Sequence, residues 1–282
     1  MGEHDIVKRT PGMPATLLSL YEDFETLGVR RGMVLLLHSS LSSLGWVCGG
    51  AVAVILALEE ILGVEGTLVM PTHSGDLTDP QDWRNPPVPE SWKDTIRDTM
   101  PPYDPDLTPT RKMGVIPEMF RKQRGVLRSE HPHVSFTAWG AQAGKVTEEH
   151  SLDFGLGEQS PLARVYDLAG WVLMLGVEHD CNTSLHLAEY RMSPHRRVID
   201  NGAPLLIEGK RQWVKIKDIE IDDSDFVTIG SEFERDTGKV RRGKVACADA
   251  MLFPQRDLVE YSVRWMTENR QTKERYEQSK NP

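Results

Sequence analysis

The chain has 282 residues, of which 39% are hydrophobic and 27% are charged, so a folded core is expected and wholesale disorder is not. Acidic residues outnumber basic ones 42 to 33, and the net charge of −9 disfavours nucleic acid as a partner and suits a cationic ligand. No apolar run approaches the roughly 20 residues that a membrane-spanning helix needs, so no membrane partner is expected.

The start of the chain and its cysteines indicate the compartment. Residues Met1 to Asp5 lack the basic start and the apolar block of a secretory signal. The three cysteines, Cys48, Cys181 and Cys247, are widely spaced and odd in number, which makes a poor disulfide framework. We therefore expect a cytoplasmic protein.

The first 70 residues predict a helix and then a strand–loop–helix–strand unit. Residues 14–27 carry one apolar face and end at Gly28, as a helix commonly does. Two continuous apolar runs, 33–37 and 67–70, are typical of strands covered on both faces, and an apolar helix over 51–62 lies between them. This order implies a parallel strand pair with a right-handed crossover.

An irregular segment follows, and regular elements resume after it. Residues 71–109 are rich in proline and show no clear period, and a connection this long is usually functional. The later predicted elements are a helix over 111–122, an extended segment over 134–139, a short helix over 161–168, a buried strand over 171–175, and a helix from Thr183 that Asn182 caps.

The last third of the chain changes to short alternating strands, clearest over 211–217. We expect a β-rich lobe over about 196–245 and a terminal helix over about 255–267. The predicted fold class is α/β: a single domain over 1–282 in which a core, about 14–195, holds a central mixed sheet flanked by helices, with a small β-rich C-terminal lobe.

The loop after the first buried strand, residues 38–50, is the first candidate site. Its serines and glycines let backbone N–H groups approach an anion, and the next helix adds its positive dipole end. The loop matches neither the dinucleotide G-x-G-x-x-G pattern nor the G-x-x-x-x-G-K-[ST] phosphate loop. A loop for pyrophosphate or pantetheine and a plain tight turn at a strand end fit it equally.

His186 and Glu189 form the second candidate site. They are three residues apart, so they share one helix face and can contact each other. Because His186 falls in the first helical turn, the helix dipole favours the neutral imidazole that a general base requires. The pair also follows a buried strand, where open α/β sheets bind ligands. A histidine that merely caps or packs the helix is the alternative.

Other chemistries have weaker support. The sequence has no G-x-S-x-G elbow and no His-Glu-x-x-His motif. Nothing in the sequence indicates a lowered thiol pKa at Cys181, which argues against a cysteine nucleophile. No metal is expected. Five residues could be considered as metal ligands, but their spacing matches no standard metal site: His131, His133, His179, Cys181 and His186.

Five blocks, in order, resemble the aminoglycoside 3-N-acetyltransferase family. They are residues 38–45, 108–114, 128–136, 156–162 and 175–189. The resemblance covers about 14–195 well and the terminal lobe loosely. The [QR]-x-x-G-x-[GA] signature of the more common N-acetyltransferase superfold is absent from the sequence.

This resemblance implies that acetyl-CoA, as co-substrate, and an aminoglycoside, a cationic small molecule, bind together. The acetyl group then passes directly to the amine at position 3 of the deoxystreptamine ring, which would confer antibiotic resistance. His186 is the implied base, and Glu189 or another acidic neighbour orients it. Thr110 or a backbone N–H is the expected oxyanion donor.

The remaining site residues are expected from the same resemblance and from the needs of a cationic ligand. The residues expected to line the acetyl-CoA site are His38, Ser39, Ser40, Leu41, Ser43, Gly45 and Thr110. Carboxylates and aromatic rings expected to bind the aminoglycoside are Asp76, Asp104, Glu118, Glu158, Trp83 and Tyr103.

Three alternatives stay open at this point. The acceptor is another amine, of a metabolite or a peptide; or the chain is an inactive module that binds coenzyme A; or it is a metal-dependent hydrolase. The accepted aminoglycosides and the oligomeric state, monomer or homodimer, also stay open.

Overall fold

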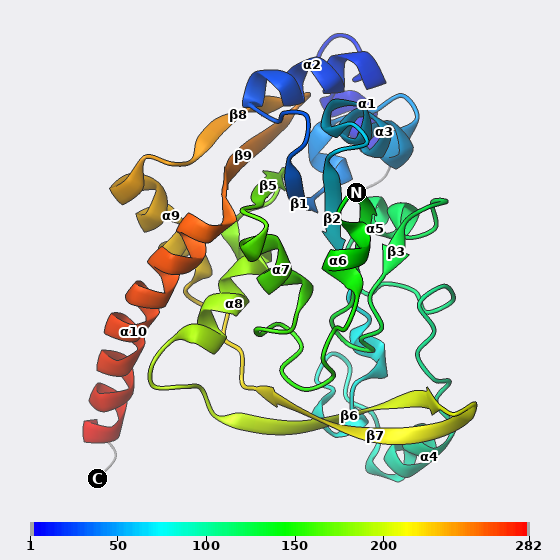
Figure 1. Ribbon diagram of the computed structural model, residues 1–282, viewed down its shortest axis with the longest axis vertical. Coiled ribbons are helices and arrows are strands. Elements are labelled where there is room, and N and C mark those ends of the chain that lie inside the picture. The colour runs from blue at the N-terminus through cyan, green and yellow to red at the C-terminus, as the bar shows by residue number, and fades with distance from the viewer. Residues whose placement is uncertain (1–2, 281–282) are drawn as a thin grey trace.

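The computed structural model describes residues 3–280, with side chains from His4 to Arg270. A seven-stranded sheet forms its centre, in the order β3-β4-β2-β1-β5-β9-β8 (Figure 1). The three inner strands β2, β1 and β5 are parallel, and every other neighbouring pair is antiparallel. The predicted α/β fold with a central mixed sheet is confirmed.

The strands of this sheet are β1 (Val34–Ser39), β2 (Thr67–Pro71), β3 (Leu127–Arg128), β4 (Phe136–Gly140), β5 (Trp171–Leu175), β8 (Arg241–Val245) and β9 (Ala248–Pro254). The predicted parallel pair is β1 and β2, and α3 (Gly50–Leu62) connects them. All five residues of β2 are buried, as expected of a strand covered on both faces.

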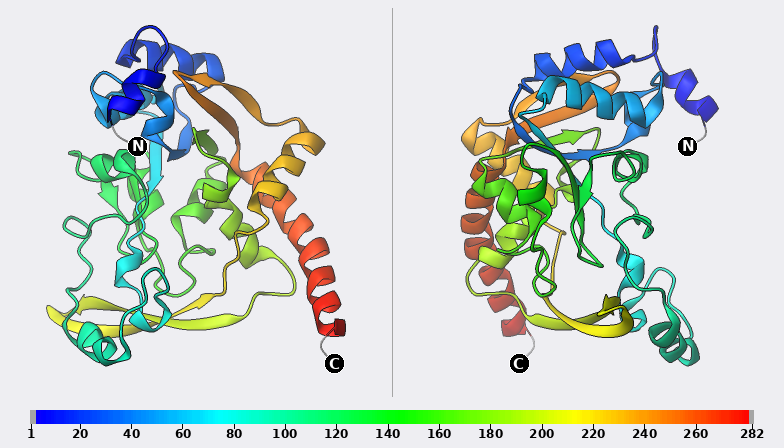
Figure 2. Two further views of the ribbon diagram at one scale, coloured as in Figure 1. Left: turned by 180° about the vertical axis from the view of Figure 1, so that it is seen from behind. Right: turned by 45° about the vertical axis from the view of Figure 1, so that its right-hand side comes forward.

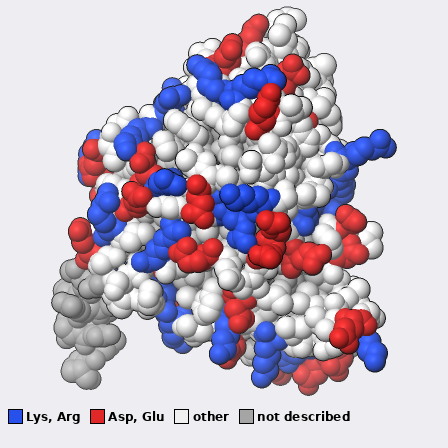
Figure 3. Space-filling view, in the orientation of Figure 1, with Lys and Arg blue, Asp and Glu red and all other residues white. Residues whose placement is uncertain are grey.

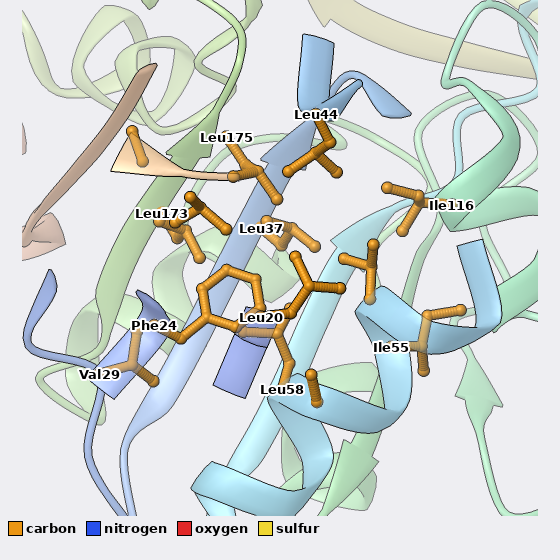
Figure 4. Packing of buried hydrophobic residues seen from close by; sticks show 14 of the residues in the cluster. Leu20, Phe24, Val29, Leu37, Leu44, Ile55, Leu58, Ile116, Leu173 and Leu175 are labelled. Atoms are coloured by element: carbon orange, nitrogen blue, oxygen red, sulfur yellow. The ribbon is translucent and has the colours of Figure 1, made fainter. Parts of the chain in front are cut away.

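Helices cover both faces of the sheet. On one face, α2 (Leu17–Leu27), α3 and α5 (Val115–Phe120) pack against the strands. Figure 4 shows Leu37 and Leu173 of the sheet pointing toward Phe24 of α2 and Leu58 of α3. The other face is covered by α6 (Ala143–Thr147), α7 (Pro161–Asp167), α8 (Ser184–Arg191), α9 (Phe226–Thr237) and α10 (Gln255–Lys280).

Two predicted helices are shorter than expected, and local backbone chemistry explains both. The first begins at Leu17, because the Thr16 side chain accepts a hydrogen bond from the Ser19 amide and Ser19 bonds back to Thr16. The helix predicted over 111–122 is only α5, because Lys112 and Gly114 have φ values of 58° and 88°, which a right-handed helix excludes.

The segment 196–245 is mixed rather than β-rich throughout. Its first part is a two-stranded antiparallel ribbon of β6 (Val198–Ile207) and β7 (Lys210–Ile219), which lies far from α2 in Figures 1 and 2. The next part is α9, whose Phe226, Ile229 and Phe233 are buried on one helix face. The last part, β8, joins the central sheet. The single-domain organisation stays a prediction.

The irregular segment after β2 contains short helical turns and α4 (Lys93–Thr99), and it packs on the ribbon. The Arg211 guanidinium donates to the Met100 carbonyl at 2.7 Å, and the Tyr103 amide donates to the Pro204 carbonyl at 2.9 Å. Within residues 3–280, no helix combines the length and the apolar character that crossing a membrane requires.

Candidate active site

The parallel strands β2, β1 and β5 end at the same edge of the sheet, and each is followed by polar residues. His73 follows β2, the serine loop over residues 39–45 follows β1, and His179 and Cys181 follow β5. The carboxyl edge of parallel strands is where open α/β sheets bind ligands. Polar groups from three separate parts of the chain therefore meet at one place.

The serine loop forms one wall of a cleft of about 540 Å³, called here the serine cleft. The Ser40 amide donates to the Leu175 carbonyl at 2.9 Å, and the Ser43 hydroxyl donates to the Gly176 carbonyl at 3.0 Å. Gly176 has a φ of 69°, and a Cβ there would collide with Ser43. These contacts fix the loop against the end of β5.

Four of the residues predicted to bind acetyl-CoA line this cleft: Ser39, Ser40, Leu41 and Gly45. The other three do not. His38 is buried with its Nε2 3.4 Å from the Thr183 hydroxyl, Ser43 turns toward Gly176, and both donors of Thr110 bind Glu118.

The opposite wall of the serine cleft was not predicted. It consists of the residues between the irregular segment and α5, Lys112, Met113, Gly114 and Val115. A Cβ on Gly114 would lie 3.8 Å from the Ser39 carbonyl oxygen, so the two walls come close together. Residues 112–114 belong to the sequence block 108–114, but no role was predicted for them.

His186 and Glu189 contact each other on α8, as their spacing predicted. The distance from His186 Nδ1 to Glu189 Oε2 is 2.7 Å. The His186 side chain keeps 14% of its surface exposed, whereas Glu189 is wholly buried. The Asn182 side chain accepts a hydrogen bond from the Ser184 amide at 3.1 Å, but the N-cap residue of α8 is Thr183, which makes no side-chain cap bond, so the predicted Asn182 cap is wrong. With Nδ1 bound to a carboxylate, the Nε2 lone pair of a neutral His186 faces away from Glu189.

Glu189 is held by a cation that the sequence did not indicate. Arg270 of α10 donates to Glu189 Oε1 at 2.6 Å, and the Asp222 amide donates to the same oxygen at 2.9 Å. Arg270 also forms two hydrogen bonds to the Asp225 carboxylate. Although burial opposes it, these ion pairs with Asp225 and Glu189 raise the pKa of Arg270. Glu189 therefore contacts Arg270 through Oε1 and His186 through Oε2.

Two further histidines lie near this pair and are neutral. Burial, with positive charge on His179 or His186 as a smaller cause, lowers the pKa of His38 to about 3. Burial likewise lowers the pKa of His73 to about 3, with His186 and His38 as the next causes. The edge of the sheet therefore holds several uncharged imidazoles at physiological pH.

The lowered pKa values of the histidines allow a prediction of how the unfolding free energy depends on pH. Burial lowers the pKa of six of them: His38 and His73 to about 3, His133, His150 and His179 to about 4, and His131 well below its ordinary value. Below about pH 6.5 the unfolded chain binds protons that the folded chain excludes, so the unfolding free energy falls on acidification. Burial raises the pKa of Glu59 and of Asp218, which has the opposite effect on the unfolding free energy. These two carboxyl groups are outnumbered by the six histidines.

Urea unfolding at several pH values between about 7.5 and 5 checks this expectation. Each histidine contributes up to about 1.4 kcal/mol per pH unit over this range. An unfolding free energy that stays constant or rises as the pH is lowered would contradict the burial of neutral imidazoles.

The predicted substrate-binding residues are spread over the irregular segment and already have partners. Glu118 binds Arg121, Lys122 and Thr110, and despite burial these contacts lower its pKa. The other partners are Arg111 for Asp76, the Asp106 and Leu107 amides for Asp104, Arg191 for Glu158, the Ser129 carbonyl for the Tyr103 hydroxyl, and the Thr78 hydroxyl for Trp83.

These residues are not gathered in one cavity. Tyr103 lines a cavity of about 620 Å³ between β3 and the ribbon, whereas Glu158 and Glu189 line another of about 650 Å³ beside Tyr190. Asp76, Trp83, Asp104 and Glu118 do not line the serine cleft. Their role in substrate binding stays a proposal.

A cysteine or metal mechanism gains no support from the geometry. Burial, with Asp180 beside it, raises the pKa of the Cys181 thiol to about 11, so the thiol is protonated at neutral pH. In the described part of the chain, no three His, Cys, Asp or Glu side chains are grouped as metal ligands would be. All three cysteines are free thiols.

A family model described as aminoglycoside 3-N-acetyltransferase matches residues 36–267. The chain belongs to this family. Members of the aminoglycoside 3-N-acetyltransferase family are acetyl-CoA-dependent transferases, so the resemblance of the five sequence blocks and the prediction of an acetyl-CoA-dependent enzyme are confirmed.

Named relatives agree with this assignment. The chain is 48% identical over 257 residues, covering 91% of this chain and 94% of the relative, to the prophage-derived aminoglycoside N(3′)-acetyltransferase-like protein YokD of Bacillus subtilis (strain 168). It is 38% identical over 284 residues to aminoglycoside N(3)-acetyltransferase VII of Streptomyces paromomycinus, covering 95% and 96% of the two chains.

Solved structures of the family share the fold. The YokD structure is 46% identical, with a TM-score of 0.93, covering 95% of this chain and 98% of YokD. The AAC-IIIb structure with CoASH has 31% identity and a TM-score of 0.80, covering 90% and 97%. The AAC-VIa structure with bound sisomicin has 28% identity and a TM-score of 0.81, covering 92% and 99%.

Proposed function

We propose that this enzyme transfers the acetyl group of acetyl-CoA to the amine at position 3 of the deoxystreptamine ring of an aminoglycoside, with His186 as general base. The observation that carries the proposal is the 2.7 Å contact between His186 and Glu189, at the sheet edge that also bears the serine cleft. The related structures with CoASH and with sisomicin support the same pair of substrates.

In this proposal the serine cleft holds the pantetheine arm of acetyl-CoA. The lining groups Ser40 and Ser42 offer hydroxyls to its amides, while Leu41 and Val115 offer apolar surface. The cleft opens at the carboxyl ends of the parallel strands, so the thioester end reaches the edge where His38 and His186 lie. Binding both substrates together makes the transfer effectively unimolecular.

The chemical step then follows from the orientation of His186. Glu189 accepts the Nδ1–H hydrogen bond, so Nε2 carries the lone pair and takes a proton from the attacking amine. The amine nitrogen forms a bond to the thioester carbon, the C–S bond breaks, and the leaving thiolate takes up a proton. Glu189, held by Arg270, stabilises the imidazolium that forms.

Acetylation removes one positive charge from the drug, which weakens its attraction to anionic RNA and would give resistance. We place this reaction in the cytoplasm, where free thiols such as Cys48, Cys181 and Cys247 persist. Among the described side chains on the face drawn in Figure 3, acidic and basic groups are interspersed, and no basic band of the kind that binds nucleic acid is present there.

The test is to incubate the purified protein with acetyl-CoA and sisomicin while free thiol release is followed. We expect one acetyl group per drug molecule, which NMR of the product places on the position-3 amine. Parallel reactions with a polyamine and with a peptide that has a free amino terminus test the alternative acceptors. Thiol release with either of these but not with sisomicin, or an acetyl group at another position, would refute the proposal.

A further inference from the structure

His73 lies near the candidate site and was not predicted to have a role. It lies two residues beyond the end of β2, at the start of the irregular segment. Its Nε2 is shielded from solvent and has no hydrogen-bond partner among the described residues. Leaving a buried polar atom unpaired costs free energy, so such an atom calls for an explanation, of which a ligand is one.

The ring of His73 lies on the same side of the sheet as His186. It contacts Phe136 edge-on, with the ring centres 5.3 Å apart, and Phe136 belongs to the buried cluster that includes Leu185 and Leu187 of α8. His186 packs edge-on against Phe226 of the same cluster, at 4.9 Å. Both imidazoles therefore contact this buried cluster at the carboxyl edge of the sheet.

The backbone of His73 is also joined to the serine cleft. Its carbonyl accepts a hydrogen bond from the Arg111 amide at 2.8 Å, and the residues after Arg111 form the unpredicted wall of the cleft. Asp76 and Arg111 form an ion pair that joins the same two segments. His73 thus lies between the wall that faces the serine loop and the helix that bears the proposed base.

The protonation state of His73 limits the roles that its ring can have in the reaction. Burial lowers its pKa to about 3, so at neutral pH the ring cannot serve as a base. A neutral imidazole still carries one N–H and can donate it to an oxygen atom. The expected donor Thr110 is already engaged, because its amide and its hydroxyl both donate to Glu118.

We propose that His73 is a catalytic residue that donates a hydrogen bond from Nε2 to the carbonyl oxygen of the acetyl thioester. This proposal rests on the proposed acetyl transfer. When the amine attacks, the carbonyl π electrons move to the oxygen, and the Nε2–H group stabilises the negative charge there. When the intermediate collapses, the carbonyl bond forms again and the C–S bond breaks. His73 keeps its proton throughout.

The test is an infrared difference spectrum of acetyl-CoA labelled with carbon-13 at the carbonyl and bound to the enzyme. A hydrogen bond lowers the frequency of the carbonyl stretch, so His73→Phe, which keeps a ring but no donor, should raise it. His73→Gln keeps a side-chain N–H and should restore part of the shift. For His73→Phe, kcat with sisomicin should fall by about 10²–10³-fold while the acceptor KM stays close to that of the wild type.

His150→Gln is the matched control. His150 is buried, but unlike the shielded Nε2 of His73 both of its ring nitrogens have partners, Ser129 for Nδ1 and Gly155 for Nε2. Its loss should therefore lower stability and leave the carbonyl band in place. If His73→Phe does not fold, nitrogen-15 NMR of the wild-type imidazoles replaces it: the His73 Nε2–H signal should shift with acetyl-CoA and not with CoA.

Two results would overturn the proposal: an unchanged carbonyl band in folded His73→Phe, or a rise in the acceptor KM alone. The spectrum needs no acceptor, so it separates this proposal from the proposed function. A band that shifts as expected in an enzyme that acetylates no aminoglycoside would refute the acceptor and leave the contact with His73 standing.

Discussion

His186→Asn is expected to lower kcat for acetyl transfer to sisomicin by about 10²–10⁴-fold. Asparagine fills part of the same space and still reaches Glu189, but it cannot take the proton of the attacking amine. Because His186 does not line the serine cleft, the Kd for CoA should stay close to the wild-type value. Initial rates from free thiol release, with calorimetry for CoA binding, measure the two quantities.

The control is His195→Asn, in which an exposed histidine of the segment after α8 is replaced. This variant should keep the kcat of the wild type. If His186→Asn also keeps it under the same conditions, His186 is not the base.

Arg270→Met is expected to destabilise the protein by about 3–5 kcal/mol, because it leaves the wholly buried Glu189 carboxylate without its cation. The variant should also lose turnover, since an unpaired buried carboxyl group tends to take up a proton and then no longer orients His186. Urea unfolding and thiol-release rates are the measurements.

The double variant Glu189→Gln with Arg270→Met separates stability from catalysis. Removing both charges should recover much of the lost stability, because no buried charge is left unpaired. Turnover should stay low, because no carboxylate faces His186 Nδ1. A double variant with normal turnover would mean that the ion pair is only structural.

The sequence predicted the parts of the site that depend on short spacing. The three-residue separation of His186 and Glu189 was enough to predict their contact, because a helix brings such side chains together. The buried runs over 33–37 and 171–175 likewise predicted the strands β1 and β5, whereas their pairing beside the serine loop was seen only in the structure.

The parts that depend on chain segments far apart were missed. Arg270 follows Glu189 by 81 residues, and nothing in a polar C-terminal helix indicates which arginine is buried. His73 lies in a segment without periodicity, so its position beside the sheet edge depends on tertiary contacts alone. The carboxylates proposed for the drug have intramolecular partners, which composition cannot reveal.

A crystal structure with both CoA and sisomicin bound tests the central claim most directly. We predict that the sulfur of CoA lies at the end of the serine cleft and that the position-3 amine lies about 3 Å from His186 Nε2. An amine bound elsewhere, for example in the cavity beside Tyr190 and out of reach of that nitrogen, would contradict the account.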